Sequence, residues 1–433
     1  MAELAGNPEK CAPSIHVAGS KGKGSVTSML AAMLTEAGYR VGRYMSPHVV
    51  DIRERLCLGD TYFDEDVYLS AGEELRRIAE ERIPSLAGSQ RTLFDPSTEE
   101  GCEPTFWELL TLLFFLCARY AKCDVMTVET GMGGRLDSTN VLDPLVSVIT
   151  LIELEHTNIL GGTITEIAGE KAGIIKQGKP LVLAKQCGEA LEVFRKKAEE
   201  KNSPLIYLPE TAELTNINVT SQGTGFSLMF KSPHLLCAAN QRFDASPHGS
   251  FFSIPIPGKV QAENAVTAIS ALLTAFPLIK RDAIRHGLAK LKIPARFEKI
   301  SEEPPFIIDG AHTPESLSRC IETFRSLYGE GGVLLFGCAS DKDAEAMAKA
   351  AHKSFSKIII TTPGNFKASN PEQVYDSFVS VAGEEKTHLV KDTKDSVMQA
   401  VFFAKNSRRG EMLPILGTGS FYLVSEIRKI FVF

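Results

Sequence analysis

The sequence has no excess of basic residues and no clustered cysteines. Its formal net charge is −6 at pH 7, whereas a general nucleic-acid binder needs a basic face. We therefore expect no nucleic-acid partner, although a local basic pocket is still allowed. The nine cysteines are scattered, and none forms a Cys-x-x-Cys pair. This odd, scattered set argues against a disulfide framework or a zinc site and favours buried free thiols in a reducing compartment.

The chain also lacks a recognisable leader and a long apolar run. Its first residues, MAELAGNPEKCAPSIHVAG, show no basic start followed by an apolar core, so we expect no signal peptide. The most apolar stretch, residues 106–121, contains Glu108 and is too short to span a bilayer. We expect this stretch to form a buried helix in a cytoplasmic protein that has no membrane partner.

Short β-branched runs alternate with longer helical patterns along the 433 residues. Their continuous apolar character indicates strands that are covered on both faces, as in parallel sheets with crossover helices. The sequence therefore predicts an α/β fold of two or three domains. The predicted strands are 14–19, 123–130, 144–150, 179–185, 304–310, 331–338, 356–362 and 412–420.

Two segments depart from this alternation. Residues 82–105 are rich in Pro, Gly, Ser and charge, which is typical of a loop or insertion. Residues 203–257 alternate and turn like antiparallel strands, and a predicted helix follows at 261–276.

A domain boundary is predicted near residue 297. Pro294 interrupts the pattern there, and a fresh strand–helix alternation begins at residue 304. This divides the chain into an N-terminal domain, 1–296, and a smaller C-terminal domain, 297–433.

Residues 16–25 read HVAGSKGKGS and lie between an apolar run and a helical pattern. A glycine-rich turn between a strand and a helix directs backbone N–H groups toward an anion, and the helix dipole adds to this attraction. Lys23 would reach the phosphates of a nucleotide, and Ser25 would offer a hydroxyl near its metal. The usual P-loop has GKS or GKT, whereas here Gly24 follows Gly22-Lys23. A turn that binds nothing is the alternative, but the stretch favours a nucleotide.

Two later stretches place polar residues just after predicted strands. Residues 42–56 contain Ser46, Arg53 and Arg55, and such a charge run alone is more typical of a solvated face. Glu129 ends a buried strand ahead of a glycine turn, where α/β proteins present site residues. A carboxylate there suits Mg²⁺, although Glu129 could instead stabilise the turn.

Single residues further on are ambiguous by themselves. His156 follows a strand, but a lone histidine is more often structural than a ligand. Lys171 lies in a helix predicted to begin near Thr163, and alone it is more typical of a surface residue.

Four polar residues lie near the ends of elements around the predicted boundary. Asn264 lies in a predicted helix, Arg296 lies beside the boundary, and Asp309 and His312 end a strand of the second half. Groups at the strand ends of two domains could converge on a cleft, although an Asp-Gly turn needs no ligand.

Taken in order, these stretches resemble one family, the folylpolyglutamate synthases and dihydrofolate synthases, which are ATP-dependent amide ligases related to the Mur ligases. The resemblance runs from about residue 16 to 426. Its motifs are GSKGKGS, SPHVVDIRERL, ETGMGGRLDSTN, EHTNILGGT, EKAGIIKQGKP, QAENAVTA, PARFE, DGAHTPES, CASDKD and GTGSFYLVSE. Each motif is weak alone, but ten in this order are specific, and SPH with RER separates this branch from its cell-wall relatives.

The resemblance implies an N-terminal P-loop ATPase domain with a mainly parallel sheet and a smaller Rossmann-like C-terminal domain, with ATP in the cleft between them. It implies small-molecule partners only, namely ATP, L-glutamate and a folate or dihydropteroate, and a monomer. The pterin end of the acceptor would lie near residues 46–56. The implied nucleotide contacts are Gly19, Gly22, Lys23, Gly24, Ser25, Asn264, Arg296, Asp309 and His312.

The same resemblance implies two Mg²⁺ ions. Ser46 and Glu129 would hold the first, and His156 and Lys171 would help hold the second. Lys171 matches the lysine that becomes carbamylated in the family. Lys23, Lys171, His156 and Arg296 are the implied catalytic residues.

The chain departs from the family pattern at three places. Lys21 stands where the family usually has an asparagine, so it either adds charge beside the triphosphate or points to solvent. Thr313 replaces an asparagine, and Glu155 replaces the aspartate that usually precedes His156. Nucleotide affinity is the property that these changes would alter most directly.

Amide formation in water needs an activated carboxyl group. We expect the γ-phosphoryl group of ATP to pass to the acceptor carboxylate, and the glutamate amine to attack the resulting acyl phosphate. Three other readings stay open at this point: another Mur-type amino-acid ligase, a P-loop kinase or ATPase that forms no amide, and a silent binding protein.

Overall fold

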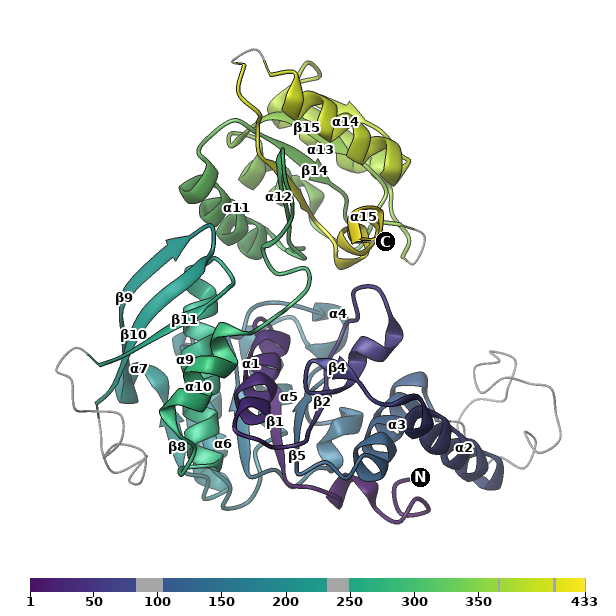
Figure 1. Ribbon diagram of the computed structural model, residues 1–433, viewed down its shortest axis with the longest axis vertical. Coiled ribbons are helices and arrows are strands. Elements are labelled where there is room, and N and C mark those ends of the chain that lie inside the picture. The colour runs from purple at the N-terminus through teal and green to yellow at the C-terminus, as the bar shows by residue number, and fades with distance from the viewer. Residues whose placement is uncertain (83–103, 232–248, 365–366, 408–409, 433) are drawn as a thin grey trace.

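The computed structural model describes residues 1–82, 104–231, 249–364, 367–407 and 410–432 (Figure 1). The predicted loop at 82–105 lies almost wholly outside these ranges, as do Cys102 and Cys237. Among the described residues the chain forms an eight-stranded, a three-stranded and a six-stranded sheet. This arrangement is the α/β fold that the sequence predicts.

The eight-stranded sheet has the order β4-β3-β2-β5-β1-β6-β7-β8. Strands β2, β5, β1, β6, β7 and β8 run parallel, whereas β3 and β4 pair antiparallel at one edge. The parallel strands are buried on both faces, which explains their continuous apolar runs. The strands are β1 Ser14–Ala18, β2 Val41–Tyr44, β3 Leu56–Leu58, β4 Thr61–Tyr62, β5 Val125–Glu129, β6 Val146–Ile149, β7 Leu181–Leu183 and β8 Leu205–Tyr207.

Helices cover both faces of this sheet. Helices α1, α9 and α10 pack on one face in a single apolar cluster. Helices α2, α3, α5 and α6 cover the other face through two smaller clusters. The helices of this half are α1 Lys23–Glu36, α2 Glu65–Arg82, α3 Phe106–Tyr120, α4 Thr157–Leu160, α5 Ile164–Ala172, α6 Gly188–Glu200, α7 Leu208–Thr211, α9 Lys259–Ala275 and α10 Arg281–Ala289.

The predicted antiparallel segment is confirmed in part. Strands β9 (Ala212–Thr220), β10 (Gly223–Phe230) and β11 (Ser250–Ile254) form an antiparallel sheet. Phe226 and Phe252 anchor it to the cluster around α9 and α10. The start at residue 203 was wrong, because β8 pairs parallel with β7 and so belongs to the main sheet.

The six-stranded sheet occupies the upper part of Figure 1 and has the order β12-β13-β17-β14-β15-β16. Only β12 is antiparallel within it. Helices α11, α12 and α13 cover one face, and α14 and α15 cover the other. Its elements are β12 Glu298–Glu302, β13 Pro305–Ile308, α11 Pro314–Tyr328, β14 Gly332–Phe336, α12 Ala344–Ala351, β15 Phe355–Ile360, α13 Pro371–Ala382, β16 Thr387–Leu389, α14 Thr393–Lys405, β17 Ile415–Thr418 and α15 Phe421–Val432. The domain limits 1–296 and 297–433 stay a prediction.

The apolar stretch at 106–121 forms helix α3, which is largely buried as predicted. Glu108 and Thr105 form a capping box at its start, so the glutamate stabilises the helix terminus. No helix in the described part of the chain is long and apolar enough to cross a membrane.

The cysteines of the described chain are free thiols, as predicted. Five of them are buried: Cys57, Cys117, Cys123, Cys320 and Cys338. Cys11 and Cys187 are exposed, so the prediction of burial was wrong for these two.

Helix α10 packs closely on the C-terminal half of α1. A Cβ atom on Gly287 would lie 2.6 Å from the Cα of Met33. We expect Gly287→Ala to lower the free energy of unfolding by about 1–3 kcal/mol, because helix α1 would have to shift. Urea denaturation measures this loss.

Gly72→Ala is the matched control, since Gly72 lies in helix α2 and a Cβ there would meet no atom within 4 Å. It should stabilise the protein by up to about 1 kcal/mol. Equal effects of the two substitutions would contradict this packing argument.

Candidate active site

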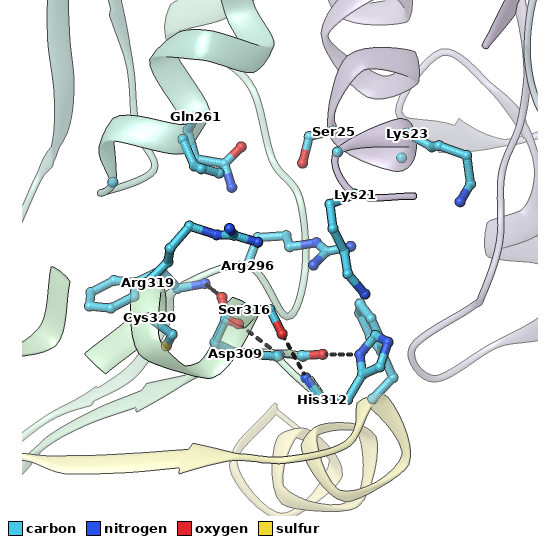
Figure 2. A pocket seen from close by; sticks show the side chains of 18 of the residues that line it. Lys21, Lys23, Ser25, Gln261, Arg296, Asp309, His312, Ser316, Arg319 and Cys320 are labelled. Atoms are coloured by element: carbon cyan, nitrogen blue, oxygen red, sulfur yellow. Dashed lines mark hydrogen bonds between the residues drawn. The ribbon is translucent and has the colours of Figure 1, made fainter. Parts of the chain in front are cut away.

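A cavity of about 640 Å³ lies between the eight-stranded and six-stranded sheets. It opens at the carboxyl ends of β1, β5 and β13, where α/β proteins usually present ligand sites. Figure 2 shows Lys21, Arg296 and Arg319 extending into this space from both sides. The predicted site residues that line it are Gly22, Lys23, Gly24, Ser25, Ser46, Glu129, His156, Asn264, Arg296, Asp309 and His312.

The glycine-rich stretch forms the turn between β1 and α1. Gly22 has φ 90° and caps the helix without a side-chain hydrogen bond, so the first-turn N–H groups of α1 remain available to an anion. A Cβ on Gly22 would lie 2.4 Å from Oδ1 of Asn264. Asn264, from α9, therefore lies directly against the turn.

Gly19 is not among the residues that line the cavity, but the turn depends on it. Its φ is 144°, and a Cβ there would lie 1.8 Å from Oγ1 of Thr150. Its carbonyl oxygen accepts hydrogen bonds from Nζ of Lys23 at 2.9 Å and from Nζ of Lys171 at 2.8 Å. Gly19 thus places two lysines, and its predicted contact with a nucleotide stays a prediction.

Glu129 lies at the end of β5 and is only 3% exposed. Its Oε2 accepts a hydrogen bond from the backbone N–H of Ser46 at 3.0 Å. Burial raises the pKa of Glu129 to about 7, against the opposing effect of Lys23. A cation beside this carboxylate would favour its charged form, so the environment of Glu129 fits a metal ligand.

The described residues include no group of three or more His, Cys, Asp and Glu side chains that could hold a metal ion. An ion at Glu129 would therefore complete its coordination with phosphate oxygens and water, as Mg²⁺ commonly does.

Lys171 is 1% exposed, so the expectation of a surface lysine was wrong. Helix α5 begins after Thr163, as predicted, and carries Lys171 in its last turn beneath the cavity wall. Nζ of Lys171 donates to Oε1 of Glu155 at 2.9 Å, in addition to the Gly19 carbonyl. Burial lowers the pKa of Lys171 to about 8, and the positive charge of Lys23 acts in the same direction.

Lys21 points into the site and not to solvent. Its Nζ lies 3.9 Å from Oε2 of Glu155. Glu155 therefore lies between the ammonium groups of Lys21 and Lys171. Burial alone would raise the pKa of Glu155, but Lys23, Lys171 and Lys21 together lower it to about 2. Two departures from the family pattern, Lys21 and Glu155, thus contact each other.

The segment that leads into the six-stranded sheet contributes Arg296, and the end of β13 contributes Asp309 and His312. The Arg296 guanidinium lies 4.7 Å from the ring centre of Phe421. Asp309 accepts from the N–H groups of Phe297 and Ala311, and burial raises its pKa. Burial lowers the pKa of His312 to about 3, so its imidazole is neutral at pH 7.

Thr313 caps helix α11, since its hydroxyl accepts from the N–H of Ser316. The replacement of an asparagine at this position therefore retains a capping residue.

An ion pair between the two halves was missed by the sequence reading. Nη2 of Arg319, on α11, lies 2.8 Å from Oε1 of Glu153, which follows β6. The two residues are more than 160 positions apart in the sequence and neither belongs to a recognisable motif, so no local pattern could have predicted the pair.

His156 is exposed at the cavity. It lies at the start of α4 and has a φ of 48°.

The loop after β2 is held by Glu54, which accepts from the N–H groups of Val49, Val50 and Asp51. Arg53 is exposed, as expected for a solvated face. Arg55 is 8% exposed and donates through Nε to Nδ1 of His48, so that expectation was wrong for Arg55.

Two family models match the chain. The Mur ligase middle domain matches residues 86–272, and the Mur ligase glutamate ligase domain matches residues 295–419.

Curated relatives match over almost the full length. The chain is 34% identical to the dihydrofolate synthase/folylpolyglutamate synthase of Bacillus subtilis (strain 168), over 99% of this chain and 92% of that protein. It is 32% identical to the folylpolyglutamate synthase of Lacticaseibacillus casei, over 98% of this chain and 91% of that protein.

Solved structures show the same fold. Mycobacterium tuberculosis folylpolyglutamate synthase complexed with ADP and AMPPCP superposes with a TM-score of 0.86 at 26% identity, covering 100% of this chain and 94% of that one. A folylpolyglutamate synthase complex with AMPPCP and folate gives a TM-score of 0.81 at 27% identity, covering 100% and 93%.

Glu155 balances two ammonium groups, so we expect Glu155→Gln to lower the free energy of unfolding by about 3–5 kcal/mol in the ligand-free protein, because an unpaired buried charge remains. Adding Lys21→Met should recover part of this loss, which a double-mutant cycle by urea denaturation would measure.

Glu199→Gln is the control, since Glu199 is exposed at the end of α6 and should change stability by no more than about 0.5 kcal/mol. Strict additivity of the Lys21 and Glu155 substitutions would show that the two charges do not interact.

Proposed function

Because the chain belongs to the folylpolyglutamate synthase/dihydrofolate synthase family of ATP-dependent ligases, we propose that it joins L-glutamate to the carboxylate of a folate or of dihydropteroate. The observation that carries this proposal is the cavity that both halves of the chain line. In it, the glycine-rich turn lies on one side and Arg296 and His312 lie on the other. A ligase needs this arrangement, since ATP and the carboxylate must meet where water is excluded.

The proposed reaction has two steps. A carboxylate oxygen of the acceptor attacks the γ-phosphorus of ATP, ADP leaves, and an acyl phosphate forms. The amine of L-glutamate then attacks the acyl carbon, the carbon–oxygen bond breaks, and inorganic phosphate leaves with the amide in place. The amine must lose a proton, which the departing phosphate can accept. His312 is too weak a base for this role at pH 7, because burial lowers its pKa to about 3.

The glycine-rich turn would bind the phosphates of ATP. The backbone N–H groups of residues 22–25 would donate to the phosphate oxygens. Nζ of Lys23 would leave the carbonyl oxygen of Gly19 and contact the phosphate oxygens instead. Asn264, Arg296, Asp309 and His312 would contact the nucleotide from the other side. ADP and AMPPCP in the structures of relatives support this assignment.

Ser46 and Glu129 would hold one Mg²⁺ ion. His156 and Lys171 would help to hold a second Mg²⁺ ion. Bound Mg²⁺ would offset the negative charge that spreads over the transferred phosphoryl group. The first site fits the buried carboxylate of Glu129. The second requires a change, because Lys171 contacts two hydrogen-bond acceptors and has the charge of an ammonium there.

Carbamylation of Lys171 would supply that change. A pKa near 8 gives the amine a neutral fraction at pH 7, and the neutral amine is the form that adds CO₂. The resulting carbamate is an anion, so it would have to move away from Glu155 or share a cation with it.

The acceptor would enter along the loop that follows β2. This loop borders the cavity through Ser46 and Pro47, and the ring of Trp107 is partly exposed beneath Arg55. We further propose a cytoplasmic monomer, since the two halves of this chain together supply both walls of the cavity and the described thiols are unpaired.

Product analysis by mass tests the function. The purified protein is incubated with ATP, Mg²⁺ and L-glutamate, with dihydropteroate in one tube and tetrahydrofolate in another. We expect a gain of one glutamyl residue with equal amounts of ADP and phosphate in at least one tube. Lys23→Ala is the control and should lower turnover by orders of magnitude.

The other outcomes would redirect the assignment. ATP hydrolysis without glutamate addition would favour an ATPase or a Mur-type ligase with another substrate. Turnover within about tenfold of the unchanged protein in Lys23→Ala would remove Lys23 from the phosphate site.

The carbamate has its own test. Lys171→Ala should abolish ligation, and short carboxylic acids such as formate or acetate should restore part of it by replacing the missing anion. Glutamate addition is measured with and without the acid. Lys176→Ala is the control, because Nζ of Lys176 donates to the carbonyl of Asn140, whereas Nζ of Lys171 donates to Gly19 and Glu155. Retained activity without rescue would contradict the assignment.

A further inference from the structure

A second cavity, of about 980 Å³, opens beside the first. Both cavities are lined by Pro47 and Tyr422, so they are neighbours. One wall of the second cavity is the loop that follows β2, and the other is formed by residues at the start of α14 and along α15. Figure 1 shows α15 on the side of the six-stranded half that faces the eight-stranded half.

The lining of this cavity is rich in positive charge, although the whole chain has a net charge of −6. The charged side chains are Arg55, Lys391, Lys394 and Lys429, against Asp392 and Glu426. Both carboxylates are already engaged. Asp392 caps α14 by accepting from the N–H of Asp395, and Glu426 accepts from Lys429.

Two of the cations have unused donors. Arg55 is 8% exposed and stacks over Trp107, yet its Nη1 is buried without a hydrogen-bond partner in the described structure. An unsatisfied donor on a buried charge is costly, which indicates a missing acceptor. Lys394 is exposed and has no ion pair or hydrogen bond with the described part of the chain. Lys391 is already paired with Glu372.

A positively charged cavity beside the first one fits the direction in which a polyglutamate chain would lengthen. On the proposed function, every new glutamate is added at one fixed point beside ATP. An acceptor that already has several γ-linked glutamyl residues must therefore extend outward from that point. Each internal residue of this tail exposes one α-carboxylate, whereas a pterin ring in the same space is uncharged.

We propose that the second cavity binds the α-carboxylates of the internal γ-glutamyl residues of a polyglutamylated acceptor. This inference rests on the proposed function. Arg55 donates to the carboxylate nearest the first cavity, because its guanidinium has a free donor and a planar shape that suits a carboxylate. Lys394 binds a carboxylate further along the tail, and Lys429 binds another when it exchanges Glu426 for the tail.

Comparison of acceptors tests this inference. Ligation is measured with tetrahydropteroyl monoglutamate and triglutamate, for the unchanged protein and for the double variant Lys394→Glu/Lys429→Glu. We expect the ratio of kcat/KM for triglutamate to that for monoglutamate to fall about 5- to 10-fold, through KM, since two attractions become repulsions. High salt should reduce this difference, because exposed charges are screened.

Lys405→Glu is the matched control. Lys405 is exposed at the far end of α14 and does not line the cavity, so the ratio should stay within about twofold of the unchanged protein. An unchanged ratio in the double variant, or the same fall in Lys405→Glu, would overturn the inference.

A binding measurement tests the second cavity even if the protein proves not to be a ligase. If the unchanged protein ligates neither acceptor, binding of tri-γ-L-glutamate alone is measured by calorimetry. Binding that is at least 5-fold weaker in the double variant than in Lys405→Glu would support an anionic-tail site independently of catalysis. Absent or equal binding would overturn it.

Discussion

One carbonyl oxygen, that of Gly19, determines where two lysine ammonium groups lie. It accepts hydrogen bonds from both Lys23 and Lys171. This position requires glycine, because the Cβ atom of any other residue would collide with Thr150. Glu155 then offsets the second ammonium group and also that of Lys21. The phosphate-binding turn and the buried lysine of α5 are therefore one electrostatic unit, and a ligand that displaces one lysine alters the charge balance of the other.

The strands and their ends could be predicted from the sequence for a physical reason. Continuous apolar runs such as β1, β5 and β13 are buried on both faces. Glu129 ends β5 and Asp309 follows β13, so each lies at the carboxyl edge of its own sheet. Local patterns are sufficient for this, since burial and strand direction fix where those residues lie.

Burial of charge could not be predicted in the same way. Lys171 and Arg55 look like surface residues in the sequence, because part of their environment comes from other elements of the fold. Lys171 donates to the carbonyl of Gly19, and Arg55 stacks over Trp107. The Glu153–Arg319 ion pair and the place of β8 in the parallel sheet also depend on contacts between distant segments. Only the resemblance to a ligase family singled out Lys171, and it did so through sequence and not through geometry.

If the cavity between the two sheets activates a carboxylate by phosphoryl transfer, one oxygen atom of that carboxylate must leave with the phosphate. We would therefore label both oxygens of the reacting carboxylate with ¹⁸O and analyse by mass the phosphate released during ligation. We expect one ¹⁸O atom in each phosphate, because the carboxylate oxygen that attacks phosphorus leaves with it. Label in AMP would show adenylation instead, and unlabelled phosphate would show that ATP is hydrolysed without activating the acceptor.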